Sequence, residues 1–149
     1  MRFFDLSRAI RLTRLCLFAG AIALGFSGIA SAQNLCPVKA QMLQGKYVFA
    51  GSGYNIVAGV AQPKALVEVI NFNGDGTLSV PAATVTINGV IAQAPSGGTG
   101  SYTLDSSCAG TLTFSNGPSF DIFVSSKGDK IWMIQTNPNT VLQGEATKQ

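Results

Sequence analysis

The sequence predicts an all-β protein, an eight-stranded antiparallel meander barrel preceded by a signal peptide. Three observations support this fold class. Segments after residue 45 alternate apolar with small or polar residues, as half-buried strands do. Turn-forming Gly, Asn, Asp and Pro separate these segments roughly every 8 to 15 residues. No helical periodicity longer than two turns occurs beyond the first 32 residues.

Each expected strand is an apolar or alternating segment between two turn signals. The first places Tyr47 and Phe49 on one face, and the second is rich in Val and Ile. The eight expected strands are residues 46–52, 66–72, 77–87, 99–104, 110–115, 120–125, 130–136 and 140–147. Residues 53–64 are expected to form a loop with a short extended piece at 56–57, and residues 90–94 can extend the pairing.

Two turn signals are especially strong. Residues 73–76 read Asn-Gly-Asp-Gly, and residues 88–89 read Asn-Gly, and these dipeptides supply the positive φ that tight hairpins need. Between them, Pro81 cannot donate a hydrogen bond to a neighbouring strand, so the strand 77–87 is expected to bend or bulge there.

Short turns make consecutive strands antiparallel neighbours, which is a meander. An open meander of eight strands would expose two edges, and closure into a barrel removes them. An eight-stranded barrel is either filled by its own side chains or holds one small ligand. A two-sheet sandwich of the same strands is the structural alternative.

Residues 1–32 have the order of a secretory signal peptide: a basic region with four arginines, an apolar run at 15–30, and small residues at Ala30 and Ala32. Cleavage is expected between Ala32 and Gln33. The alternative is an uncleaved membrane anchor, but the run of about 16 residues is shorter than the ~20 that a helix needs to span a bilayer. The protein is therefore expected to be exported, to the periplasm or beyond, with a lead-in at 33–45 and a barrel domain at 46–149.

After signal removal the formal charge is zero, because six lysines balance six acidic residues. No basic patch is available to displace counterions, so no nucleic-acid partner is expected. Histidine is absent, which excludes a Ser-His-Asp triad and removes the commonest zinc ligand. Asn71, Asn73 and Asp75 are spaced as in a calcium loop, but Ala82 replaces the bidentate Glu at its end, so a plain turn is favoured. No metal, no cofactor and no stable membrane span are expected.

Two cysteines remain in the mature chain, Cys36 and Cys108. Export places them in an oxidising compartment, and two cysteines allow one pairing. Such a bridge would close a loop of roughly 70 residues and stabilise the fold by on the order of 4 kcal/mol. The alternative is a pair of free, buried thiols.

Several strand-and-turn motifs of the mature chain are familiar, among them the sequence VINFNGDGTLS at residues 69–79 and GTGSYTLD at residues 98–105. Together with residues 45–49, 108–113, 135–138 and 144–149 they resemble a group of uncharacterised bacterial exported proteins with an allene-oxide-cyclase-like or calycin-like β-barrel. The resemblance implies an eight-stranded barrel and a Cys36–Cys108 bridge. Plant cyclases of that structural class shape a fatty-acid epoxide in an apolar barrel, but none of their functional positions is matched here.

Glu68 is the one charged residue in the apolar strand 66–72. If its side chain pointed inward, it would be a carboxylate with a perturbed pKa and a site candidate, although a solvent-facing position is favoured. Phe72, Tyr102 and Trp132, together with Tyr47 and Phe114, are candidates to line an apolar pocket with it, although the favoured alternative is that these aromatic residues simply form the core.

Three classes of function follow from this fold. The favoured one is a binding module that takes one small apolar ligand inside the barrel. The others are a structural or surface-interaction protein with a filled barrel, and a cyclase-like enzyme that uses shape and one carboxylate. An internal cavity of roughly 300 Å³ or more would favour the first. The sequence makes no prediction of oligomeric state.

Overall fold

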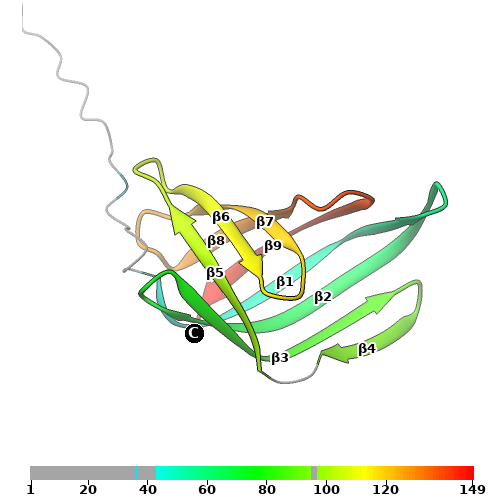
Figure 1. The fold of residues 1–149 in the computed structure, drawn as a ribbon, viewed down its shortest axis with the longest axis horizontal. Coiled ribbons are helices and arrows are strands. Elements are labelled where there is room, and N and C mark those ends of the chain that lie inside the picture. The colour runs from blue at the N-terminus through cyan, green and yellow to red at the C-terminus, as the bar shows by residue number, and fades with distance from the viewer. Residues whose placement is uncertain (1–35, 37–42, 95–96) are drawn as a thin grey trace, which may run out of the picture. The chain divides into compact units, whose positions relative to one another are not determined.

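The computed structural model describes Cys36 and residues 43–94 and 97–149, and these are entirely β-strands and turns (Figure 1). The expected signal peptide, its cleavage point and most of the lead-in lie outside the described residues. Within the described part of the chain, no helix has the length and apolar character needed to cross a bilayer.

The described residues form nine strands, and eight of them close into an antiparallel barrel in the order β2-β1-β9-β8-β7-β6-β5-β3, with β3 pairing back to β2. The ninth, β4, pairs with β3. The strands are β1 Gln44–Val57, β2 Val60–Asn73, β3 Thr77–Ile87, β4 Val90–Ala94, β5 Gly98–Leu104, β6 Ala109–Phe114, β7 Ser119–Val124, β8 Lys130–Gln135 and β9 Thr140–Lys148. The predicted eight-stranded meander barrel is confirmed, and the sandwich alternative is wrong.

The first hairpin is much longer than the sequence predicts. The expected loop 53–64 is instead the outer half of β1 and β2, which remain paired up to Val57 opposite Val60. Ala58 and Gly59 form the connecting turn, with φ of 50° and 80°. Ala-Gly is a weaker turn signal than Asn-Gly, which explains why the hairpin was not predicted.

Pro63 is tolerated inside this hairpin because of where β3 ends. Its carbonyl oxygen accepts a hydrogen bond from the backbone N–H of Asn88 at 2.8 Å, just beyond the last paired residue of β3, Ile87. The missing N–H of Pro63 therefore lies on the β3 side, beyond the last paired residue of β3, where no ladder hydrogen bond is lost.

β3 changes neighbours along its length. Its first half, Thr77–Val80, pairs with β5, and its second half, Ala83–Ile87, pairs with β4. The register against β2 shifts opposite Val69–Asn71, so a bulge lies at the predicted position beside Pro81. Beyond this bulge, β3 pairs with β4 and no longer with β5. The hydrogen-bonded wall of the barrel is therefore interrupted between the second half of β3 and β5.

The barrel has two chemically different ends. The disulfide end carries the turns at residues 74–76, 105–108 and 125–129, together with the start of β1 and the end of β9. The hairpin end carries the turns at residues 58–59, 88–89, 115–118 and 136–139. In Figure 1 the β1–β2 and β3–β4 hairpins project together from the hairpin end.

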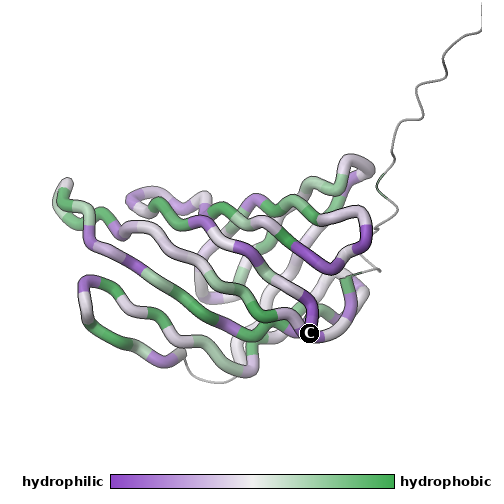
Figure 2. The backbone as a smooth tube through the Cα atoms, turned by 180° about the vertical axis from the view of Figure 1, so that it is seen from behind, coloured by the Kyte–Doolittle hydropathy of each residue, from purple (hydrophilic) through white to green (hydrophobic). Residues whose placement is uncertain are grey.

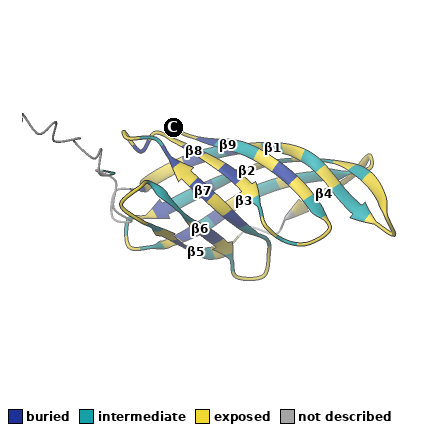
Figure 3. Cartoon of the chain, turned by 90° about the horizontal axis from the view of Figure 1, so that it is seen from above, coloured by how far each residue is buried: buried dark blue, intermediate teal, exposed yellow. Residues whose placement is uncertain are grey.

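Side chains alternate between the packed interior and the outer surface along every barrel strand, as the alternating colours in Figure 3 show. The interior near the disulfide end is filled by aromatic residues: the rings of Tyr47 and Phe72 meet edge to face at 5.0 Å, as do those of Phe72 and Tyr102. The buried apolar core comprises Leu43, Tyr47, Phe49, Ile70, Phe72, Leu78, Val80, Tyr102, Leu112, Phe120, Ile122, Val124, Ile131, Met133, Leu142 and Ala146.

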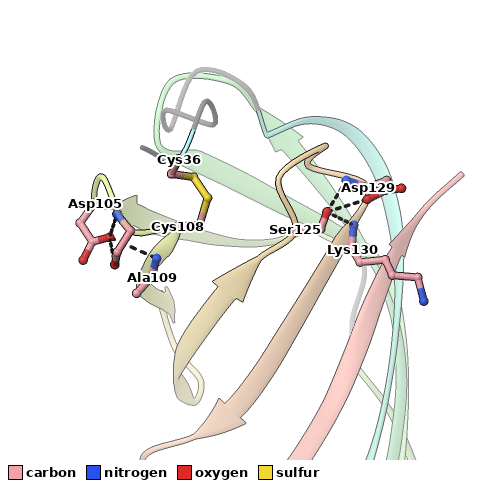
Figure 4. Close-up of a disulfide and its surroundings, with 8 residues drawn as sticks. Cys36, Asp105, Cys108, Ala109, Ser125, Asp129 and Lys130 are labelled. Carbon is pink, nitrogen blue, oxygen red and sulfur yellow. Dashed lines mark hydrogen bonds between the residues drawn. A yellow bond between two sulfur atoms is a disulfide. The ribbon is translucent and has the colours of Figure 1, made fainter. Parts of the chain in front are cut away.

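Cys36 and Cys108 form a disulfide at this end, with Cα atoms 5.0 Å apart (Figure 4). Cys108 is held in a left-handed conformation, φ 65°, by the turn around Asp105. One carboxylate oxygen of Asp105 accepts hydrogen bonds from the backbone N–H groups of Ser107 and Ala109. The backbone N–H of Cys36 also donates to the carbonyl of Ser106 at 2.7 Å, so the bridge and the turn together tie Cys36 to the β5–β6 connection.

Candidate functional site

A cleft of about 490 Å³ lies where the barrel wall divides. β2 and β3 supply one side, and the start of β5 and the β6–β7 turn supply the other. Its lining is mostly aliphatic and small, with two charged residues: Lys64, Leu66, Glu68, Val80, Ala83, Val85, Gly97, Gly98, Thr99, Phe114, Ser115, Asn116, Gly117 and Pro118. The volume lies within the range of small-molecule sites, and the interior is therefore hollow at this end while it is packed at the other.

Glu68 points into the barrel, where its residue is only 7% exposed, so the favoured solvent-facing position is wrong. It lies opposite Phe49 on β1 and Ala83 on β3. Strand alternation is the physical reason: Leu66 and Ile70 face inward, and a residue at even spacing between them faces the same way.

The Glu68 carboxyl is buried without a full set of hydrogen bonds. Its Oε1 is buried and has no hydrogen-bond partner among the residues that the structure describes. Burial raises the pKa of Glu68 to about 7, and the nearby positive charge of Lys64 offsets part of that rise. At neutral pH the carboxyl is thus present both with and without its proton, and it can donate or accept a hydrogen bond.

Lys64 faces the same interior from the outer end of β2, four residues before Glu68. Its Nζ donates a hydrogen bond to Oε1 of Gln135 on β8 at 3.2 Å. Burial lowers the pKa of Lys64, and the Glu68 carboxylate works in the opposite direction. Lys64 and Glu68 therefore place a cation and a carboxyl on the otherwise mostly apolar lining of the cleft, and the Gln135 amide accepts the hydrogen bond of Lys64.

Phe72 and Tyr102 lie together in the packed core near the disulfide end, not in the cleft. The hydroxyl of Tyr102 donates to the carbonyl of Leu43 at 3.0 Å, so its polar group is used within the core. The aromatic residue that does line the cleft is Phe114, at the end of β6.

Trp132 lies on the outer wall and is 48% exposed, so the prediction that it lines the interior is wrong. Its neighbours on β8, Ile131 and Met133, are the buried residues, and alternation sends Trp132 outward with Phe123 opposite it on β7. Trp132 borders a shallow hollow of about 690 Å³ over the small residues of β1 and β9. The described side chains that border it offer no buried, unpaired polar atom comparable to Glu68 Oε1.

The sequence pointed to two residues of the cleft, Glu68 and Phe114, and missed Lys64, Ala83 and Val85. Strand alternation was the signal that could have found Lys64. Lys64 and Glu68 are four positions apart, so their side chains face the same side of any continuous strand. The expected loop over residues 53–64 concealed this relation. The apposition of Ala83 and Val85 with β2 depends on pairing between strands and has no local signal.

No group of three or more His, Cys, Asp or Glu side chains in the described part of the chain is arranged to hold a metal ion. Comparison of the chain with protein-family models, with curated proteins and with solved structures finds no match. The cleft itself is the feature that points to a function, because its apolar wall can exclude water from a ligand while Glu68 forms a hydrogen bond with the ligand's polar group.

Proposed function

We propose that the barrel binds one small, largely apolar ligand that carries a single neutral hydrogen-bonding group such as a hydroxyl. The observation that carries this proposal is the buried, unpaired Oε1 of Glu68 at the side of an apolar cleft of about 490 Å³. A buried polar atom without a partner is costly, and a ligand hydroxyl would remove that cost.

The charges at the cleft favour a neutral polar group over an ionic one. A ligand ammonium would be attracted by Glu68 but repelled by Lys64. A ligand carboxylate would be attracted by Lys64 but repelled by Glu68. A hydroxyl can donate to the ionised form of Glu68 and accept from its protonated form, so it suits both states near neutral pH.

The test uses decanol as the probe and isothermal calorimetry as the measurement. Saturable binding at one site is expected. Ala83→Phe places a ring in the cleft and should abolish binding, whereas Thr84→Phe adds the same ring at the adjacent, outward-facing position and should leave it unchanged. Glu68→Leu should weaken decanol binding about tenfold through loss of one hydrogen bond to an ionisable group. Absence of saturable binding, or equal effects of the two Phe variants, would overturn the proposal.

We also propose that the protein is exported, as the resemblance to exported calycin-like barrels implies. The disulfide between Cys36 and Cys108 supports this, since such bridges persist in oxidising compartments. Mass spectrometry of the protein recovered from the periplasm or medium is expected to show Gln33 as its first residue. Recovery of the full-length chain from the cytoplasm alone would contradict export.

A further inference from the structure

Charged residues are distributed unequally between the two ends of the barrel. Every turn of the disulfide end contains at least one charge, among them Asp75, Asp105 and Lys127. The four turns of the hairpin end contain none, and residues 51–63 and 76–104 form two long stretches without a single Lys, Arg, Asp or Glu. The charge nearest along the chain to the β1–β2 tip is Lys64, which faces the interior, and the charge nearest to the β3–β4 tip is Asp75, in the turn before β3.

The two hairpin tips expose aliphatic side chains in place of these charges. Val60 is 63% exposed at the tip of β1–β2, and Val90 and Ile91 are 71% and 70% exposed at the tip of β3–β4. Val57, opposite Val60, is half exposed. In Figure 2 both hairpins carry hydrophobic segments close to their turns.

The β3–β4 tip is also joined to the side of the β1–β2 hairpin, below the Ala58–Gly59 turn. Lys64 on β2 is paired with Ile87 on β3, and the Asn88 N–H donates to the Pro63 carbonyl at 2.8 Å between the two hairpins. Four exposed aliphatic side chains are thus presented from one end of the molecule on a backbone that is hydrogen-bonded across both hairpins.

Such an end is unusual for a surface that faces only water. Soluble proteins protect edge strands and turns with charges or proline, and an uncharged β4 with a free edge lacks that protection. We propose that the hairpin end docks on a lipid bilayer, with Val57, Val60, Val90 and Ile91 entering the boundary between headgroups and acyl chains.

The dimensions fit shallow docking. From Lys64 to Gly59 the strand extends about 16 Å at 3.3 Å per residue, whereas interfacial elements bury their apolar side chains about 5–10 Å deep. The β1–β2 hairpin can therefore bury its tip while Glu68 and the charged disulfide end stay outside the hydrocarbon. Lys64 pairs with Ile87, which pairs with Val90, so it lies level with the β3–β4 tip, where its side chain faces the barrel interior.

A second copy of the chain fits this end less well. The free edge of the five-residue β4 is about 17 Å long, and the remaining surface is two narrow turns. A stable dimer needs roughly 800 Å² from each partner over a continuous face. Two projecting points are better suited to penetrate a fluid layer than to cover another folded surface.

Docking goes beyond the proposed ligand binding and does not depend on it, because the tips are separate from the residues that line the cleft. If both hold, the cleft opens near the membrane, since it shares Lys64 and the β6–β7 turn with the hairpin end. An apolar ligand could then pass from the bilayer into the cleft with little exposure to water.

Flotation of the purified, disulfide-bonded protein with vesicles of phosphatidylcholine tests the docking without any ligand. The protein is expected to float with the vesicles, and high salt should not release it because the docking end has no charges to screen. Val60→Glu combined with Val90→Glu should lower the apparent affinity by at least about tenfold. Val67→Glu is the matched control: it lies on the same strand, is 53% exposed on the outer wall, and should float like the wild type.

A fluorescent reporter keeps the test independent of effects on folding. Trp132 is the single tryptophan, so Val90→Trp in a Trp132→Phe background reports on the tip alone. Its emission should shift to the blue with phosphatidylcholine vesicles, and that of Val67→Trp in the same background should not.

Three results would overturn the docking proposal. They are failure of the wild type to float, equal loss of binding in the tip and control variants, and binding that requires added phosphatidylglycerol and disappears at high salt. Dimerisation that the tip variants abolish, seen by analytical ultracentrifugation without flotation, would assign the tips to a second copy. Failure of decanol binding with intact flotation would overturn the proposed function and leave the docking unaffected.

Discussion

Lys64 and Glu68 face the same interior from one strand, yet their polar atoms are satisfied differently. Lys64 Nζ donates to Gln135 on β8, three strands away around the barrel, whereas Glu68 Oε1 has no hydrogen-bond partner within the described part of the chain. The two charges still influence each other's pKa, but burial dominates for both. The barrel therefore keeps one carboxyl that its own side chains leave unsatisfied.

The stability of the protein should depend on pH through Glu68. Its pKa is raised from 4.5 to about 7 in the folded state, so the folded protein holds a proton that the unfolded chain has released between these values. The contribution of Glu68 to the free energy of unfolding should therefore be largest below about pH 4.5. It should fall by about 3 kcal/mol as the pH rises through about 7.

Urea denaturation across this pH range, compared between the wild type and Glu68→Gln, measures the effect. The variant cannot titrate and should lose the decline. An identical decline in both proteins would show that another group carries it.

Lys64→Met should raise the pKa of Glu68 above its wild-type value, because the Lys64 charge lowers it. A carbon-13 NMR titration of the Glu68 carboxyl measures this directly. Lys127→Met removes a charge from a turn at the disulfide end and should leave the titration unchanged. A shift of equal size in both variants would mean that net charge, and not proximity, controls the pKa.

Removing the Cys36–Cys108 bridge should lower the free energy of unfolding by about 4 kcal/mol, because the cysteines are 72 residues apart in sequence and the bridge restricts the unfolded chain. The double variant Cys36→Ser, Cys108→Ser avoids a lone thiol. Chemical denaturation measures the loss, and wild type treated with reductant should reproduce it. A loss below about 1 kcal/mol would mean that the lead-in contributes little to the fold.

Gly110→Ala should destabilise the barrel by about 1–3 kcal/mol, since a Cβ there would overlap the carbonyl oxygen of Thr103 on the paired strand. Gly98→Ala is the control, because its Cβ would meet Val80 Cβ at 3.4 Å, an ordinary contact. Thermal unfolding of the two variants should separate them clearly. Equal melting temperatures would show that β6 can move away from β5 at little cost.

Local signals in the sequence were sufficient for most of the barrel. Alternation and Asn-Gly or Asp-Gly turns predicted the strands from Thr77 onward, and Pro81 marked the bulge in β3. These features are encoded within a few neighbouring residues, so no knowledge of distant contacts is needed. The Ala58–Gly59 turn carried a weak local signal, and the full length of β1 and β2 was missed for that reason.

The candidate site depended on contacts between distant segments. By itself the sequence indicated the all-β class, the antiparallel meander order and, for a chain cleaved after Ala32, the single possible pairing of Cys36 with Cys108. Only the tertiary structure decided that Glu68 points inward, that Trp132 points outward and that β3 leaves β5 to open the cleft. The facing of a strand depends on which side of the closed sheet becomes the interior, and closure involves every strand at once.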